Sequence, residues 1–175
     1  MFLLQEHGKT TVLRDIVRQI SNGIKCINFN GLTVGLIDER SEIASLYEGI
    51  SRNDIGIRTD VIENVKKSDG MKMLVRSMAP NVIVADEIGN ASDIDAINYA
   101  ICSGCKGIFT AHGNSIDDLK NNKIIKELID SHIFEIIIVL DKFNKGKEKD
   151  IYIFDKEKSQ YRLLEYINKK IVNDY

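Results

Sequence analysis

Four consecutive residues near the start of the chain, Gly8-Lys9-Thr10-Thr11, carry the groups needed to hold the phosphates of a nucleotide. A glycine lets the backbone approach phosphate oxygens, and the start of a helix offers amide protons that have no partner inside the helix. Lys9 adds a positive charge, and the hydroxyl of Thr10 is a suitable ligand for Mg²⁺. The pattern therefore indicates the second half of a phosphate-binding loop.

The first half of this motif departs from the pattern. The full motif G-x-x-x-x-G-K-[ST] has a glycine where this chain has Leu3. Residues 1–4 are too few to supply both a strand and the loop, so we expect the strand before the loop to be missing. The helix after Lys9 is better supported, because residues 12–20 place apolar side chains on one face and Asn22-Gly23 predicts its end.

A second candidate site follows the apolar run Val82 to Ala85, which ends directly in Asp86-Glu87. A buried strand that ends in two carboxylates can hold Mg²⁺ through the first and orient or deprotonate a water molecule through the second. Because this pair follows Gly8-Lys9-Thr10 in the correct order, the sequence predicts a site for ATP and Mg²⁺.

Polar residues follow two further apolar runs. The run 32–37 ends in Asp38-Glu39-Arg40-Ser41-Glu42, and the run 106–111 is followed by His112. The acidic residues are either part of the same site or a solvated strand end, and the nearby phosphate loop favours the site. His112 is either structural or a sensor of the terminal phosphate.

The other elements alternate in the manner of an α/β fold with a mostly parallel sheet. We predict helices at 70–78, at 115–120 and at 124–131, and a further helix that Ser92 or Asp93 caps and that ends before Ser103-Gly104. We also predict a strand at 134–140 and antiparallel strands at 151–154 and 161–166. Residues 51–69 lack periodicity and are predicted to form a long loop. The length of 175 residues predicts a single domain, 1–175.

Composition and net charge exclude only a few classes of function. The formal net charge of −2 gives no reason to expect a nucleic-acid partner, and the absence of a long apolar stretch or signal peptide predicts a cytoplasmic protein. The odd number of cysteines, 3, argues against a disulfide framework. Cys102 and Cys105 have C-x-x-C spacing and are either a metal or redox pair or small buried residues at a helix end.

The order of four segments, GKTT, VGLIDERSEI, RSMAPNVIVADEIG and FTAHGNS, resembles the stage III sporulation protein AA family, which is similar to the secretion and pilus ATPases. The resemblance extends from Gly8 to about Phe154. It implies a P-loop NTPase fold of the RecA/AAA-like type, a three-layer sandwich around a mostly parallel sheet with antiparallel strands at the C-terminal end. It also implies that residues 8–11 are the phosphate loop and that Asp86 and Glu87 are the Walker B pair.

The same resemblance assigns further site residues. Thr110-Ala111-His112 resembles the histidine box of the secretion ATPases, and Asp38, Glu39 and Glu42 resemble their acidic box. Arg76 matches an arginine that precedes the proline of the Walker B segment, and Arg58 lies in a segment that could face a neighbouring subunit. Each arginine is either a group that completes a neighbour's site or a surface charge, and both alternatives stay open.

The resemblance implies an ATP-hydrolysing motor of a secretion channel between mother cell and forespore, assembled as a hexamer on membrane proteins at the mother-cell side. We also expect the chain to lack the family's N-terminal domain. The alternative is a non-catalytic remnant that acts as a scaffold, which the missing glycine at Leu3 and the missing strand would favour. A nucleic-acid motor is disfavoured because charged stretches such as Lys142 to Asp150 mix both signs.

Overall fold

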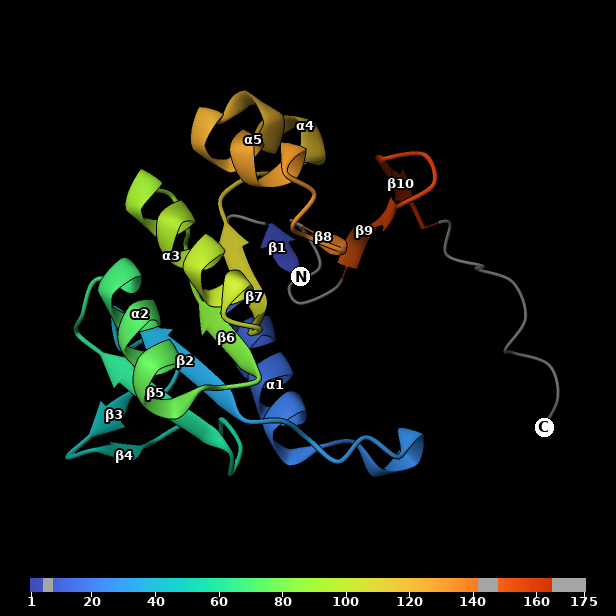
Figure 1. Cartoon of the computed structure of the whole chain (residues 1–175). Helices are drawn as coiled ribbons and strands as arrows, with labels where there is room; N and C mark the ends of the chain where they lie inside the picture. Colours follow the sequence, from blue (N-terminus) through green and yellow to red (C-terminus); the bar gives the residue numbers. More distant parts are fainter. Residues whose placement is uncertain (5–7, 142–147, 165–175) are drawn as a thin grey trace, which may run out of the picture.

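A single eight-stranded sheet forms the centre of the molecule, with a separate two-stranded ribbon beside it. The computed structural model describes residues 1–4, 8–141 and 148–164, and Figure 1 shows their arrangement. The strand order is β10-β9-β8-β1-β7-β6-β2-β5. The strands are β1 (Phe2–Leu4), β2 (Val34–Asp38), β3 (Leu46–Tyr47), β4 (Ile50–Ser51), β5 (Thr59–Glu63), β6 (Val82–Ala85), β7 (Lys106–Ala111), β8 (Ile136–Leu140), β9 (Glu148–Asp155) and β10 (Gln160–Leu163).

The sheet is parallel from β5 to β8 and antiparallel at the end formed by β9 and β10. The predicted α/β fold with a mostly parallel sheet and C-terminal antiparallel strands is therefore confirmed. The predicted strand at 161–166 corresponds to β10, although residues 165 and 166 lie outside the described residues. Most of the charged segment from Lys142 to Asp150 also lies outside them, and its last three residues begin β9.

Helices cover both faces of the sheet, which gives the predicted three layers (Figure 1). The helices are α1 (Lys9–Asn22), α2 (Lys67–Met78), α3 (Ala91–Cys102), α4 (Ile116–Asn121) and α5 (Lys123–Asp130), with a short 3₁₀ helix at Lys25–Ile27. Leu13 and Val17 of α1 belong to the core on one face, whereas Leu74 of α2 and Ile97 of α3 belong to the core on the other. Both faces of the parallel strands are thus buried, as the apolar runs require.

The strand that we expected to be missing is present. Residues Phe2–Leu4 form β1, which lies between β7 and β8 and is parallel to both. Phe2 and Leu3 are fully buried on opposite faces of the sheet, and the Phe2 ring lies 4.7 Å from the ring of Phe134. The expectation was wrong because a strand with a neighbour on each edge and a core on each face can be stable at three residues.

Two other sequence predictions need correction. The segment 51–69 contains β5, which was missed because this edge strand pairs with β2 alone and has no apolar run. The helix predicted to begin at Ser92 or Asp93 has Asn90 as its N-cap. Asp93 instead accepts hydrogen bonds from the amides of Gly89 and Asn90, which fixes the turn before the helix.

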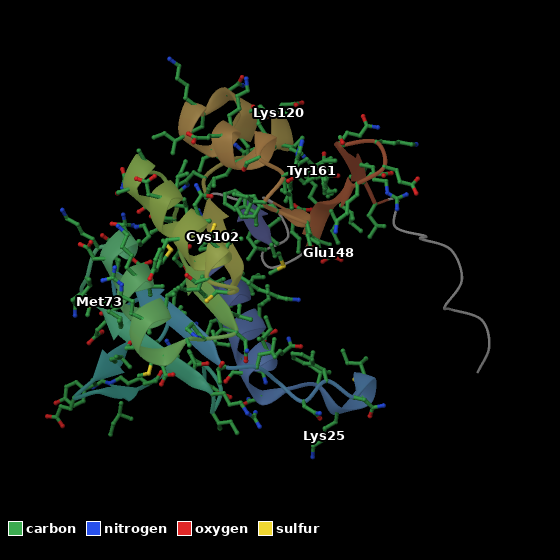
Figure 2. All side chains as sticks on the ribbon, viewed as in Figure 1. Lys25, Met73, Cys102, Lys120, Glu148 and Tyr161 are labelled. Carbon is green, nitrogen blue, oxygen red and sulfur yellow. The ribbon has the colours of Figure 1, made fainter. Side chains whose placement is uncertain are left out.

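The two cysteines of the C-x-x-C segment lie in different environments. Cys102 is the last residue of α3 and is exposed (Figure 2), whereas Cys105 is buried. Burial raises the pKa of the Cys105 thiol. Cys105 therefore fits a small buried residue at a helix end, whereas the prediction of burial was wrong for Cys102.

Among the residues that the structure describes, no helix combines the length and the apolar character needed to cross a bilayer.

The position of β1 determines where a ligand can bind. The chain passes from β1 through α1 to β2 on one side, and it later forms β8 on the other side. In open α/β sheets, ligands bind beyond the carboxyl ends of the strands at the point where the strand order reverses. In this sheet that point is the end of β1, the strand that precedes Gly8-Lys9-Thr10 in the chain.

Candidate functional site

The register of the sheet brings four strand ends to the same level. Leu4 of β1 pairs with Ala111 of β7, and Phe109 of β7 pairs with Ala85 of β6. Ala85 in turn pairs with Ile37 of β2. These strands therefore end side by side. The four predicted polar stretches follow them in the chain: Gly8-Lys9-Thr10-Thr11 after β1, residues 38–42 at the end of β2, Asp86-Glu87 after β6 and His112 after β7.

The start of α1 presents a buried positive charge. Gly8 precedes the helix in the left-handed conformation, with φ of 89°, and no side chain caps the first turn. Lys9 is only 4% exposed, and its ammonium group finds no hydrogen-bond partner among the residues that the structure describes. Burial lowers the pKa of Lys9, and the nearby carboxylates of Asp86 and Glu87 oppose this shift.

A buried ammonium without a partner is energetically unfavourable. Its position at a helix start, where backbone amides also lack partners, is the arrangement that binds phosphate. Thr11, the last residue of the predicted loop, is exposed on the first turn of α1.

Asp86 is held between two threonines at the end of β6. The Thr110 hydroxyl donates a short hydrogen bond to Asp86 Oδ1, and the Thr10 hydroxyl lies 3.4 Å from Oδ2. Thr110 is fully buried in β7, so it fixes one oxygen of the carboxylate. The other oxygen and the Thr10 hydroxyl face each other at the start of α1, and both are oxygen atoms of the kind that Mg²⁺ prefers as ligands.

Glu87 has a backbone conformation that is unusual for its residue type. Its φ is 51°, and its amide donates to the Thr110 hydroxyl at 2.8 Å. Its two carboxylate oxygens have separate partners: His112 Nε2 lies 3.1 Å from Oε1, and Arg40 Nη1 lies 2.8 Å from Oε2. The predicted acid and the predicted histidine are thus in contact, together with an arginine from the acidic segment.

The loop after β2 is built around Asp38, which is 2% exposed. Its carboxylate accepts hydrogen bonds from the amides of Glu42, Ile43 and Ala44. This arrangement makes Asp38 a positioning residue for the loop. Of the other acidic residues in the segment, Glu39 forms a short ion pair with Lys67 at the start of α2, and Glu42 is exposed.

A small pocket lies between this loop and the end of β6. It is lined by Ile37, Asp38, Glu39, Arg40, Glu42, Lys67, Asp86 and Glu87.

The two remaining predicted residues, Arg58 and Arg76, lie elsewhere. Arg58 directly precedes β5, and its guanidinium donates to the backbone oxygen of Ser21 at 2.8 Å. Arg76 is in the last turn of α2, where its Nε lies 3.4 Å from the hydroxyl of Tyr99. Both positions are at the amino ends of the parallel strands, opposite the phosphate loop, so neither arginine joins the site within its own chain.

Three residues of the site were not predicted as such: Arg40, Lys67 and Thr110. Arg40 lies in the segment 38–42, of which only the acidic residues are predicted to join the site. Thr110 is predicted only as part of the segment that resembles the histidine box. Its position at the end of a strand, beside the strand of Asp86, was the available signal. Lys67 had no signal, since it reaches the site only through the packing of α2.

The fold resembles that of solved secretion and pilus ATPases. The Legionella pneumophila ATPase DotB matches with a TM-score of 0.62 at 16% identity, covering 89% of this chain and 46% of that one. The pilus retraction motor PilT matches at 0.58 and 18% identity, covering 93% and 46%. The VirB11 ATPase of Brucella suis matches at 0.58 and 15% identity, covering 87% and 47%. At these identities the similarity establishes the fold.

Sequence comparison gives the family. Stage III sporulation protein AA of Bacillus subtilis (strain 168) is 40% identical over 150 residues, which are 86% of this chain and 48% of that protein. The uncharacterized protein ycf45 of Porphyra purpurea is 32% identical over 124 residues, covering 70% of this chain and 21% of that protein. The chain thus spans about half the length of the Bacillus relative. The family model for sporulation stage III protein AA matches residues 5–160, and the chain therefore belongs to that family.

Proposed function

We propose that this protein binds ATP with Mg²⁺ beyond the end of β1 and hydrolyses it to ADP and phosphate. The observation that carries this proposal is the buried ammonium of Lys9, which lacks a partner among the described residues at the start of a helix. The β- and γ-phosphates of ATP would satisfy both this charge and the free amides of the first helical turn.

The residues around Asp86 fit a magnesium ion. Thr10 and Asp86 would hold it, since a hydroxyl and a carboxylate already face each other there at 3.4 Å. When bound, the ion neutralises negative charge on the phosphate oxygens. Thr110 keeps the carboxylate in place through its hydrogen bond to the other oxygen.

Glu87 is positioned to orient or deprotonate the attacking water. Its carboxylate lies beside Asp86 and is 27% exposed, so water reaches it. His112 contacts the same carboxylate and is 63% exposed, which suits a residue that reports the terminal phosphate to the rest of the molecule. Glu39 supports the site indirectly, through its ion pair with Lys67.

The related structures support a nucleotide site at this edge of the sheet. The PilT structure was solved with bound ADP, and the VirB11 ATPase was solved in complex with sulphate. Both share the fold of this chain, and its four polar stretches meet where such a fold binds its ligand.

At the level of the cell, we propose that hydrolysis drives a secretion channel between mother cell and forespore. This role rests on membership of the sporulation stage III protein AA family. The protein would act as a hexamer at the cytoplasmic side of the mother-cell membrane, bound to membrane proteins, with no nucleic-acid partner. Arg58 and Arg76, which lie far from their own phosphate loop in the fold, would act on the site of a neighbouring subunit.

A non-catalytic scaffold is the second candidate, and one observation favours it. Leu3, at the position of the motif's first glycine, is fully buried inside β1. In the standard motif this position is a glycine of the loop, whereas here it is a strand residue with a large side chain. A scaffold would keep the fold and the partner surfaces but would not bind ATP.

Two substitutions separate these candidates. Lys9→Ala should weaken ATP binding at least about tenfold, whereas Glu87→Gln should not weaken binding and should slow hydrolysis by about 10²- to 10⁴-fold. Calorimetry measures the binding, and phosphate release measures the hydrolysis. Lys25→Ala is a control, because Lys25 is exposed in the segment that follows α1, away from the sheet (Figure 2). A folded parent protein that binds no ATP would establish the scaffold instead.

A further inference from the structure

Arg40 is held facing the phosphate site by a loop whose backbone is firmly anchored. Beyond the amides held by Asp38, the amide of Ser41 donates to the Asp38 backbone oxygen, and the Ser41 hydroxyl donates to Glu63 of β5 at 2.6 Å. Glu39, directly before Arg40, is fixed by its ion pair with Lys67. The base of the Arg40 side chain therefore has a defined position, while the side chain itself is 65% exposed and can reorient.

The partner of Arg40 is the carboxylate that we assign to the attacking water. Arg40 Nη1 lies 2.8 Å from Glu87 Oε2, while His112 contacts Oε1. Each oxygen keeps an acceptor site for water, but the paired Arg40 charge stabilises the ionised carboxylate and makes it a weaker base. Loss of the Arg40 contact would therefore make Glu87 a stronger base, and the arginine side chain is the longer and more flexible of the two partners.

A bound triphosphate offers Arg40 a better acceptor than Glu87. The Arg40 charge already acts on the phosphate loop, where it helps to lower the pKa of Lys9. A guanidinium has planar, paired donors that fit a phosphate as well as a carboxylate, and a terminal phosphate carries more negative charge than a single carboxylate. A diphosphate has no terminal group at the position that Arg40 would contact.

We propose that Arg40 exchanges partners: it leaves Glu87 for the terminal phosphate of ATP, and this exchange both distinguishes ATP from ADP and makes Glu87 a stronger base toward water. Arg40 is thus a positioning and discriminating residue on the same chain as the phosphate loop. The inference rests on the ATP site proposed above.

The exchange predicts a difference between nucleotides. Arg40→Gln should weaken binding of a non-hydrolysable ATP analogue by about tenfold or more and leave ADP binding within about twofold, as calorimetry with the full chain would measure. Arg40→Lys should restore part of the difference, because it keeps the charge but loses the planar fork. Arg18→Gln is the matched control, since Arg18 also pairs with a carboxylate, Asp15, but on the exposed side of α1.

A double substitution tests the exchange itself. Glu87→Gln weakens the competing acceptor, so it should tighten binding of the ATP analogue several-fold, and this gain should disappear when Arg40→Gln is also present. A gain of the same size in both backgrounds would mean that Glu87 merely repels phosphate, and it would overturn the exchange. Equal effects of Arg40→Gln on ATP and ADP would also overturn it.

Lys9→Ala keeps the two proposals distinguishable. If Lys9→Ala abolishes binding while Arg40→Gln fails to discriminate the nucleotides, only the role of Arg40 is wrong. If the parent and the Lys9→Ala variant bind neither nucleotide and both are folded by circular dichroism, the ATP site is wrong, and the role of Arg40 falls with it.

Discussion

At the scale of single residues, function and stability make opposite demands on Lys9. The ammonium is buried without a hydrogen-bond partner among the described residues, and its lowered pKa shows that its surroundings disfavour the charged form. Such a group destabilises the fold unless a ligand satisfies it. The burial of Lys9 fits the nucleotide binding that we propose, and packing alone does not explain it.

Lys9→Met should therefore raise stability while it removes nucleotide binding. We expect a gain of about 1–3 kcal/mol in the free energy of unfolding, which corresponds to about 2–4 °C in melting temperature for each kcal/mol. Thermal unfolding without nucleotide measures the gain. A less stable variant would mean that the charged side chain contributes favourably to the fold.

The same substitution has a defined pH dependence. Between the lowered native pKa of Lys9 and its ordinary value of 10.5, the folded protein releases a proton that the unfolded chain retains. Stability of the parent then rises with pH, because the unfolded state binds more protons. The advantage of Lys9→Met should consequently be full below the lowered native pKa and shrink as the pH rises through this window, as urea titrations at several pH values would measure.

Thr110 offers a second residue-level test, because its hydroxyl bonds both acids. It donates to Asp86 and accepts from the amide of Glu87, whose φ is 51°. Thr110→Val should cost about 1–3 kcal/mol, since it leaves a carboxylate oxygen and an amide without their partner. It should also slow hydrolysis by displacing both acids.

Thr33, at the amino end of β2, provides a matched control for Thr110. The Thr33 hydroxyl likewise makes two hydrogen bonds, both with Asn81, but Thr33 is exposed. Thr33→Val should leave hydrolysis unchanged and cost less stability, because water replaces the lost bonds. Equal effects of the two substitutions on hydrolysis would argue against a specific role of Thr110.

At the scale of elements, the loop after β2 depends on one carboxylate. Asp38 is buried and accepts three backbone hydrogen bonds, from Glu42, Ile43 and Ala44. Asp38→Ala should lower the free energy of unfolding by about 2–4 kcal/mol, because three buried or partly buried donors lose a charged acceptor. Urea denaturation measures this loss.

Asp38→Ala should also affect nucleotide binding at the proposed site. Because the loop carries Arg40, Asp38→Ala should reduce the preference for ATP over ADP, even though Asp38 itself is turned toward the backbone. Glu42→Ala, in the same loop but exposed, should change neither stability nor nucleotide preference. Full stability of the Asp38→Ala variant would mean that the loop is held by other contacts.

At the scale of the whole molecule, the positions of Arg58 and Arg76 bear on whether the proposed site includes residues of a neighbouring subunit. Arg58 and Arg76 lie at the amino ends of the strands, and the phosphate loop lies at the carboxyl ends. Within one chain, the two arginines and the phosphate loop therefore lie at opposite ends of the parallel strands. In a ring of identical subunits, a head-to-tail contact would bring them together.

Mixing variants tests this arrangement. If the hexamer forms and Arg76 acts on a neighbour, Arg76→Ala and Lys9→Ala subunits should each be inactive alone and partly active when mixed. Light scattering after gel filtration, with a non-hydrolysable ATP analogue, should show a mass near six chains. The same design applies to Arg58. A monomer that hydrolyses ATP at the full rate would exclude a site shared between subunits.

The sequence by itself predicted most of the helices and strands and the polar residues that meet at the carboxyl ends of the parallel strands. Gly8-Lys9-Thr10 at a helix start, Asp86-Glu87 after an apolar run and His112 after another were found because buried parallel strands and helix starts have strong local patterns. The edge strand β5 was missed because it has no such pattern. The short strand β1 was missed because its stability comes from β7 and β8 rather than from its own three residues.

Only the tertiary structure decided how the polar residues divide their roles. It turned Asp38 toward backbone amides, placed Arg40 and His112 on the two oxygens of Glu87, and put Arg76 on the opposite edge of the sheet. These outcomes depend on strand register and on the packing of α2, which join residues far apart in the chain. Local sequence identifies what a side chain can do, whereas the sheet determines which partner it meets.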